Sequence, residues 1–194
     1  MTISNIILEA LKAMINILEI SGIDYCLFGG LAMQAYKHIR ATMDVDLMLA
    51  IDSKQISNFI LKLEKEGFKF DRNRGIAKIG DFEFLRFIYT DKKQGIDIYL
   101  DLVTLKTDFQ NEIIRRKQKI DLFGFKVNIA SCEDLILLKI LSGRMLDRAD
   151  VQALIEANKQ ELDRDYLKVW ARKLGTEREL TLLMKGDEHQ KGKH

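Results

Sequence analysis

The chain has 194 residues, of which 47% are hydrophobic and 31% charged, so it is long enough to bury a core of its own. A formal net charge of only +2 excludes an overall cationic surface of the kind that dedicated nucleic-acid-binding domains carry. Cys26 and Cys132 form no Cys-x-x-Cys pair, which excludes a disulfide framework and predicts a cytoplasmic setting. The three histidines form no cluster, so the sequence gives no support to a zinc site or a Ser-His-Asp triad.

The first predicted elements are an amphipathic helix at 3–20 and a short apolar strand at 24–28 that runs into Gly29-Gly30. The helix has too many polar positions for a signal peptide, and no run of the chain reaches membrane-spanning length, so a membrane is not a predicted partner. A helix is predicted at 30–38. Glycines let the backbone approach a phosphate closely, and the N–H groups that open a helix favour an anion. The turn therefore predicts a phosphate site, although it matches neither a Walker A loop nor a G-x-G-x-x-G fingerprint.

Two acids with a spacing of two lie in the next predicted strand, at 44–50. Because side chains alternate along a strand, Asp44 and Asp46 point to one face while the apolar Val45 and Leu47 point to the other. Neighbouring carboxylates repel each other, so the pair needs a compensating cation. Mg²⁺ or Mn²⁺ would supply it, since hard cations bind carboxylate and phosphate oxygens.

A third carboxylate is expected on a neighbouring strand, because two-metal phosphoryl or nucleotidyl transfer usually needs one beside the attacking oxygen. The strand predicted at 95–103 offers both Asp97 and Asp101 on one face, and either acid could serve. Between this strand and the Asp44–Asp46 pair the sequence predicts a helix and further strands, at 53–66, 68–72 and 82–90.

Helices dominate the C-terminal part of the sequence. A helix at 108–117 and short strands near 119–129 precede helices predicted at 132–142, 147–158, 163–173 and 177–184. This order predicts an α/β (α+β) fold, in which a mixed twisted sheet flanked by helices is followed by a helical extension. We expect a catalytic core with its N-terminal helix at 1–130, a helical extension packed on that core at 131–185, and a disordered polar tail at 186–194.

Lys139 interrupts a helix that is hydrophobic on nearly every side. A buried ammonium is expensive without an anion, so Lys139 either contacts a bound anion, which is favoured, or forms an ion pair with an acid such as Glu133 or Asp150. Nearby, an ion-pair network that links two helices is favoured over direct catalysis for Arg144, Asp147 and Asp150. Ser131 and Asp134 fit a capping box that opens this helix, and His38 is expected to be an exposed helix residue.

Taken together, Gly29-Gly30, a spacer containing Arg40-x-Thr42, and Asp44-x-Asp46 resemble the nucleotidyltransferase superfamily with the DNA polymerase β-like fold. The pattern is particularly similar to the small AbiEii-like and minimal nucleotidyltransferase branch. The resemblance covers residues 23–155 and continues into the segment around Lys139. By its distance to Phe109 and to Arg115-Arg116, Asp101 looks like the third carboxylate of the family, and Asp97 is the fallback.

The resemblance implies a Mg²⁺-dependent (or Mn²⁺-dependent) enzyme that moves a nucleoside monophosphate from an NTP to an acceptor hydroxyl. Asp44 and Asp46 would bind the metal, and Asp101 would complete the catalytic and metal site. The predicted nucleotide-binding residues are Gly29, Gly30, Arg40, Thr42 and Lys139. For Arg40, pairing with Asp44 or Asp46 is an equal alternative, and for Thr42 a hydrogen bond within the turn is favoured.

The acceptor is open at this point. The resemblance allows tRNA or other RNA, as for the toxin of a toxin-antitoxin system with a separate antitoxin partner, or a small molecule such as an aminoglycoside, or a protein hydroxyl. The alternative from another class is a non-catalytic nucleotide-binding or regulatory protein that keeps the fold.

Overall fold

The computed structural model describes residues 2–80 and 82–189. The chain divides into two compact units. Unit 1 comprises Met1–Leu31 and Ala41–Ala130, and unit 2 comprises Ala32–Arg40 and Ser131–His194. The chain therefore leaves unit 1 after the glycine turn, contributes nine residues to unit 2, and returns just before the acidic strand.

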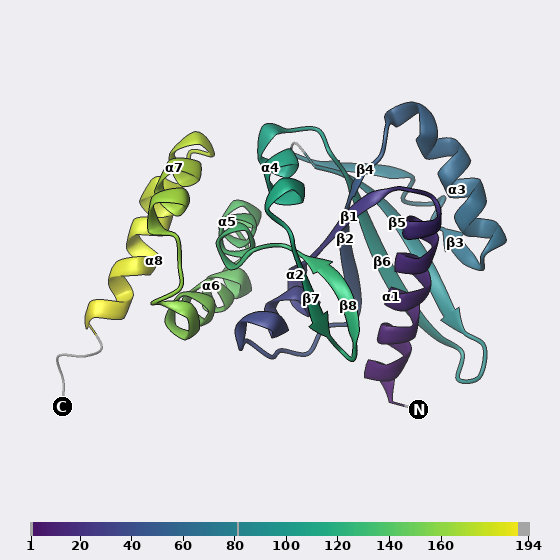
Figure 1. The fold of residues 1–194 in the computed structure, drawn as a ribbon, viewed down its shortest axis with the longest axis horizontal. Coiled ribbons are helices and arrows are strands. Elements are labelled where there is room, and N and C mark those ends of the chain that lie inside the picture. The colour runs from purple at the N-terminus through teal and green to yellow at the C-terminus, as the bar shows by residue number, and fades with distance from the viewer. Residues whose placement is uncertain (1, 81, 190–194) are drawn as a thin grey trace. The chain divides into compact units, whose positions relative to one another are not determined.

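Unit 1 is built on one mixed sheet, as the sequence predicts (Figure 1). Its strands are β1 (Asp24–Phe28), β2 (Asp44–Ala50), β3 (Phe68–Phe70), β4 (Ile76–Ile79), β5 (Phe82–Asp91), β6 (Ile96–Thr104), β7 (Gln118–Leu122) and β8 (Phe125–Ile129). They follow the order β3-β5-β6-β2-β1-β8-β7, and β4 pairs with β5 outside this path. β4 is absent from the prediction, which places no element between residues 72 and 82.

Two pairings at the centre of the sheet position the acidic strand. β1 and β2 are antiparallel, so the end of β1 lies beside the start of β2. β2 and β6 are parallel, and β6 forms an antiparallel hairpin with β5. As a result, the acids of β2 and β6 and the glycine turn all belong to one part of the sheet.

Helices of unit 1 pack on this sheet. α1 (Ile3–Ile20) contacts β1, β2 and β6, and α4 (Asp108–Arg116) contacts β1 and β2. α3 (Ile56–Lys65), which follows the short 3-10 helix η2 (Ser53–Gln55), contacts β3. Residues at helical spacing along one side of α1 are buried, including Ile7, Leu11, Met14 and Leu18. Each such apolar side chain contributes about 1.5–3 kcal/mol when it is removed from water.

The segment after the glycines is less regular than predicted. Instead of one helix at 30–38, α2 (Gly29–Ala32) gives way to the 3-10 helix η1 (Met33–Tyr36). Lys37 then adopts a left-handed conformation, with φ of 61°, and its N–H donates to the carbonyl of Met33. A left-handed residue ends a helix, and residues 38–43 form neither helix nor strand.

Unit 2 is helical outside its first segment. Its helices are α5 (Cys132–Ser142), α6 (Met145–Asn158), α7 (Arg164–Lys173) and α8 (Glu177–His189). The predicted N-cap of α5 is confirmed, because the Ser131 hydroxyl accepts from the Asp134 N–H at 3.2 Å. The second half of a capping box differs: the Asp134 carboxylate accepts from the hydroxyls of Ser131 and Tyr166, at 2.8 and 2.6 Å. Asp134 therefore links α5 to α7.

α8 extends farther than the sequence predicts. The backbone is helical to His189, so residues 186–189 of the predicted disordered tail are part of a helix. Residues 190–194 lie outside the described residues. The packing of a helical extension on the core stays a prediction.

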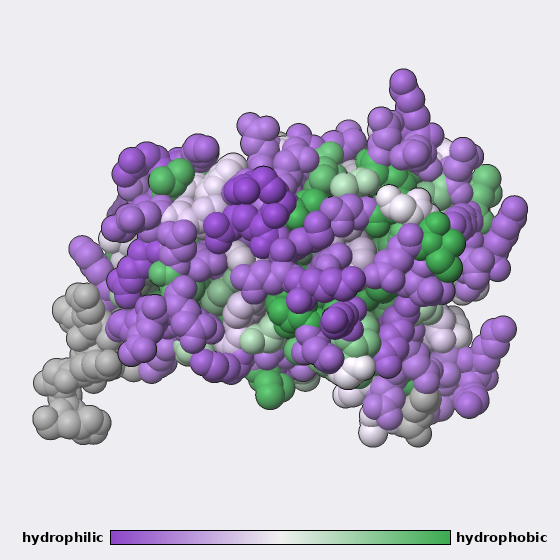
Figure 2. Space-filling view, viewed as in Figure 1, coloured by the Kyte–Doolittle hydropathy of each residue, from purple (hydrophilic) through white to green (hydrophobic). Residues whose placement is uncertain are grey.

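The surface is mainly polar on the face drawn in Figure 2, where hydrophobic residues form small, separated patches. Within residues 2–80 and 82–189, no helix combines the length and the apolar character that crossing a bilayer requires.

Candidate active site

Both glycines of the turn are packed against side chains of the segment that leads into β2. Gly29 has a left-handed φ of 68°, and a Cβ at this position would lie 2.7 Å from Cγ of Asp46. A Cβ on Gly30 would lie 2.9 Å from Oγ1 of Thr42. These approaches are shorter than van der Waals contact allows, so a side chain at either position would displace Asp46 or Thr42, and at Gly29 it would also strain the backbone. The space at the turn is limited because the turn lies against the strand that carries Asp44 and Asp46.

Asp44 and Asp46 lie on the same side of β2, as predicted, and both are half-buried, whereas Val45 and Leu47 are fully buried. In the parallel pairing of β2 with β6, Asp46 is level with Asp101 and Asp44 is level with Tyr99. Residues that are level on paired strands project to the same face, so this register places Asp101 next to Asp46.

The fallback acid, Asp97, occupies a different position. It lies two residues before Tyr99, outside the part of β6 that pairs with β2. Its exposed carboxylate accepts a hydrogen bond of 2.6 Å from the Thr90 hydroxyl. The sheet therefore brings Asp101, and not Asp97, beside the β2 acids.

Arg86 is a residue of this site that the sequence analysis missed. It lies on β5 directly opposite Asp101. Its Nε donates to Oδ1 of Asp101 at 2.7 Å and its Nη2 donates to Oδ2 at 2.5 Å. The hydrogen bonds to Asp101 raise the pKa of Arg86, and the charge of Asp44 acts in the same direction. The hairpin turn at Gly95 was the available signal, because pairing β5 with β6 around this turn sets Arg86 opposite Asp101.

The three carboxylates do not form a closed metal cluster. Among the residues that the structure describes, no group of three or more His, Cys, Asp or Glu side chains has the geometry to hold a metal ion. Asp101 is engaged by Arg86 through both of its oxygens. Metal binding by Asp44, Asp46 and Asp101 therefore stays a prediction.

Thr42 makes a contact within the chain. Its hydroxyl donates to the carbonyl of Asp44 at 3.4 Å, and its side chain packs against Gly30. This is the structural role that the sequence favours. A contact between Thr42 and a nucleotide stays a prediction.

In unit 2, Lys139 is buried and has two carboxylate partners. Its Nζ lies 2.7 Å from Oδ1 of Asp147 and 2.8 Å from Oδ2 of Asp150, which join α5 to α6. Arg144 adds a third ion pair, to Asp147 at 2.7 Å. The predicted network that links two helices is thus confirmed, with Lys139 at its centre. The ion pair with Asp150 is one of the alternatives that the sequence left open, and a contact with triphosphate stays a prediction.

This network determines the charge of its two acids. Burial alone would raise the pKa of Asp147, but hydrogen bonds from Lys139, Ser142 and Arg144 outweigh it and hold that pKa below its ordinary value. For Asp150 burial again acts upward, and hydrogen bonds from Lys139 and His38 lower the pKa below the ordinary value. Both aspartates are therefore ionised in the folded protein near neutral pH.

Asp150 also binds the segment that precedes β2. Arg40 donates to Oδ2 of Asp150 at 2.7 Å, and Nε2 of His38 lies 3.0 Å from Oδ1. The expected pairing of Arg40 with Asp44 or Asp46 is wrong, because this part of the chain belongs to unit 2. His38 is likewise neither helical nor exposed. A contact between Arg40 and phosphate stays a prediction.

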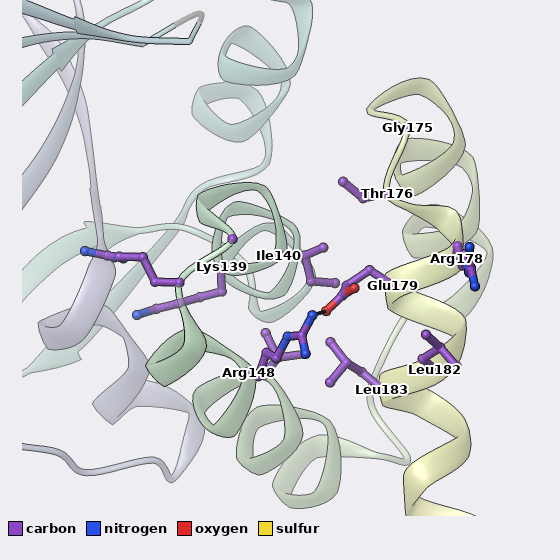
Figure 3. A pocket seen from close by; sticks show the side chains of 12 residues that line it. Lys139, Ile140, Arg148, Gly175, Thr176, Arg178, Glu179, Leu182 and Leu183 are labelled. Carbon is purple, nitrogen blue, oxygen red and sulfur yellow. Dashed lines mark ion pairs between the residues drawn. The ribbon is translucent and has the colours of Figure 1, made fainter.

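Unit 2 contains a cavity of about 480 Å³, shown in Figure 3. Its apolar lining includes Ile140, Val151 and Leu183, and an ion pair of 2.9 Å joins Arg148 to Glu179 among its lining residues. None of the predicted catalytic acids lines this cavity. The acids predicted for catalysis belong to unit 1 instead.

A family model described as "Nucleotidyl transferase of unknown function (DUF2204)" matches residues 7–185. No curated protein matches the chain.

Solved structures share its fold. An antigenic nucleotidyltransferase-like protein from Paracoccidioides brasiliensis is 20% identical, with a TM-score of 0.50 over 94% of this chain and 91% of that one. The antibiotic-resistance factor ANT(2″)-Ia, in complex with adenylyl-2″-tobramycin, is 13% identical, with a TM-score of 0.55 over 87% and 96%. The lincosamide antibiotic adenylyltransferase LnuA, bound to lincomycin, is 20% identical, with a TM-score of 0.50 over 75% and 94%. At these identities the likeness shows a common nucleotidyltransferase fold.

Proposed function

Because the chain belongs to the family of nucleotidyl transferases of unknown function (DUF2204), we propose that it transfers a nucleoside monophosphate from an NTP to an acceptor hydroxyl with the help of Mg²⁺ or Mn²⁺. One observation carries this proposal: Asp46 is flanked by Gly29 on one side and by Asp101 on the other. The proposed triphosphate contact at Gly29, the proposed metal ligand Asp46 and the third acid Asp101 are therefore neighbours within unit 1.

The donor set fits a hard divalent cation. Mg²⁺ in phosphoryl-transfer sites is held by one or two carboxylates together with substrate phosphates and water. Asp44 and Asp46 supply two half-buried carboxylates on one side of β2. Asp101 has lone pairs beyond the two that Arg86 occupies, so it can still join the site. When bound, the cation would stabilise the negative charge that develops on the transferred phosphate.

Residues of the chain would bind the triphosphate and orient the acceptor. Gly29 and Gly30, whose Cα atoms lie against the side chains of Asp46 and Thr42, would contact the triphosphate through their backbone N–H groups. The acceptor oxygen would attack the α-phosphorus, the bond to the β-phosphate would break, and pyrophosphate would leave with that electron pair. Asp101 would orient the acceptor hydroxyl or accept its proton. Thr42, Arg40 and Lys139 are secondary candidates for nucleotide contact, the last two because they carry positive charge.

For the acceptor, the first candidate is tRNA or another RNA, in keeping with the AbiEii-like branch that the sequence resembles. In that case the chain is a toxin with a separately encoded antitoxin, working in the cytoplasm, a reducing setting that suits its two buried cysteines. The second candidate is a small polyhydroxylated molecule. It is favoured by the fold shared with ANT(2″)-Ia and LnuA, whose structures contain adenylyl-tobramycin and lincomycin.

The test uses the full chain with Mg²⁺ and each α-³²P-labelled NTP, in separate reactions with total tRNA, tobramycin or lincomycin. Label that appears on one acceptor with the wild-type chain, and not with Asp44→Asn, would establish transfer and identify the acceptor class. Asp97→Asn is the matched control, because this acid lies on the same strand as Asp101 but away from the β2 acids. Equal labelling by the wild type and Asp44→Asn would contradict the proposed role of the carboxylates.

A chain that binds NTP but transfers no label to any acceptor would support the non-catalytic alternative. Binding alone can be followed by the rise in thermal midpoint that NTP and Mg²⁺ produce.

A further inference from the structure

The ion pair between Arg86 and Asp101 has an unusually well-defined geometry. Two parallel hydrogen bonds of 2.7 and 2.5 Å join the guanidinium to both carboxylate oxygens. The Arg86 and Asp101 side chains are only 22% and 13% exposed. Below the guanidinium lies the ring of Tyr99, with its centroid 5.1 Å from Cζ of Arg86. Bidentate pairs that are partly desolvated and stacked on a ring fix both partners more firmly than exposed pairs do.

Two further acids, Asp44 and Asp46, lie near the Arg86–Asp101 ion pair. Asp46 is level with Asp101, and Asp44 lies on the same side of β2. Three carboxylates that converge in this way repel one another. Arg86 offsets the charge of one of these acids, Asp101, and so lowers the negative charge that the group presents to a cation. Its strand, β5, is separated from β2 by β6.

We propose that Arg86 is the positioning residue and internal counter-ion of the carboxylate site: it fixes the orientation of the Asp101 carboxylate and limits the negative charge that the site presents to a cation. This inference rests on the proposed function, since it assigns a partner to the third acid of the same site. It also makes an unusual prediction. Removing the positive charge strengthens the attraction for a cation, whereas losing the orientation of Asp101 slows the reaction.

The experiment measures these two quantities separately. Binding of Mn²⁺ alone is followed by electron paramagnetic resonance, and kcat and KM for the NTP are measured with the acceptor that the labelling test identifies. For Arg86→Gln we expect Mn²⁺ to bind about three- to tenfold more tightly, because a neighbouring positive charge is gone. We expect kcat to fall about ten- to a hundredfold, with a smaller change in KM. Arg86→Lys keeps the positive charge but cannot form the two parallel hydrogen bonds to Asp101. Its Mn²⁺ affinity should therefore stay near that of the wild type while kcat falls.

Arg72→Gln is the matched control. Its guanidinium also bonds both oxygens of a carboxylate in unit 1, that of Glu64, at 2.7 and 2.9 Å. This variant should change neither Mn²⁺ affinity nor kcat. If Arg86→Gln does not fold, Arg86→Lys decides the question: an unchanged kcat would overturn the positioning role, and a changed Mn²⁺ affinity would overturn the counter-ion role.

Failure of this inference differs from failure of the proposed function. If the wild type binds Mn²⁺ no better than Asp44→Asn, the metal site itself is wrong. If the wild type binds Mn²⁺ and Asp44→Asn does not, but Arg86→Gln binds Mn²⁺ no more tightly than the wild type, only the role of Arg86 is overturned.

Discussion

Gly29 is fixed by two separate constraints, its backbone conformation and its neighbour. A left-handed φ of 68° is strained for any residue with a Cβ, and that Cβ would also displace the carboxylate of Asp46. The second constraint is the one that concerns activity, because it acts on the acid at the centre of the proposed site.

Gly29→Ala should therefore lower activity as well as stability. We expect a loss of about 1–2 kcal/mol in the free energy of unfolding from backbone strain, and in addition a loss of Mn²⁺ binding and of transfer. Gly95→Ala separates the two effects, because Gly95 has a φ of 65° but no atom within 4 Å of its Cβ position. Urea unfolding and Mn²⁺ titration of both variants provide the comparison. Intact Mn²⁺ binding in Gly29→Ala would contradict the proposed contact with Asp46.

Replacing each acid of β2 and β6 by asparagine should lower the transfer rate by unequal amounts. Asp44→Asn, Asp46→Asn and Asp101→Asn should each lower transfer by about a hundredfold or more, since each removes a proposed ligand. Asp97→Asn should stay within about twofold of the wild type, because this acid lies beyond the part of β6 that pairs with β2. Folding of the variants is checked by circular dichroism. An active Asp101→Asn protein would show that the third carboxylate is assigned incorrectly.

At the level of elements, the buried Lys139 holds α5 against α6. Lys139→Met would leave Asp147 and Asp150 as buried charges without their main partner. Breaking such a pair from one side typically costs about 3–5 kcal/mol. We expect this loss in the free energy of unfolding at pH 7, measured with urea. Lys168→Met is the control, because Lys168 is 63% exposed and lies 3.9 Å from Asp165. An equal effect of the two substitutions would contradict the role of the buried network.

The same network predicts how stability depends on pH. The folded-state pKa values of Asp147 and Asp150 are lowered from 3.8, so the unfolded state binds protons first as the pH falls. Their contribution is therefore complete well above pH 3.8 and is lost as the pH falls from about 4–5 through the folded-state values. Lys139→Met should lose less stability than the wild type across this acid range, because Lys139 contributes most among the groups that lower the pKa values of Asp147 and Asp150. Urea unfolding between pH 3 and pH 7 measures both profiles.

The site illustrates which features local sequence can predict. Strand periodicity correctly placed Asp44 and Asp46 on one side of β2, and apolar spacing correctly gave α1 its bounds at Ile3–Ile20. The partner of Arg40 and the role of Arg86 depend on which distant elements meet. Periodicity contains no such information, because it specifies the side of an element and not what lies opposite. The irregular path after Ala32 was missed for the same reason, since composition alone does not show that Lys37 is left-handed.

At the scale of the whole molecule, three positions join the two units: after Leu31, after Arg40 and after Ala130. The segment between the first two makes its contacts within unit 2. Arg40 and His38 bind Asp150, and the carbonyl of Tyr36 accepts from Asn158 at 3.1 Å. The glycine turn and the acidic strand are therefore tethered to opposite ends of a segment that another unit holds.

A fragment of residues 1–130 should consequently be a poor enzyme even though it contains Asp44, Asp46 and Asp101. It lacks Asp150 and Asn158, so residues 32–40 lose the contacts that order them. We expect lower solubility and no transfer from this fragment alone, with partial recovery when residues 131–189 are co-expressed. Solubility after expression and label transfer are the measurements. Full activity of residues 1–130 alone would show that the segment needs no partner in unit 2.

The hairpin of β5 and β6 has a consequence for the order of folding. Arg86 and Asp101 are 15 residues apart and join across one tight turn, whereas Asp101 meets Asp46 only after a much longer loop has closed. Short loops close sooner because they lose less chain entropy. We expect the hairpin to assemble first and to bring Asp101 to β2 with its charge already compensated. The parallel pairing of β2 with β6 can then form without the full repulsion of three acids, before any metal ion reaches the chain.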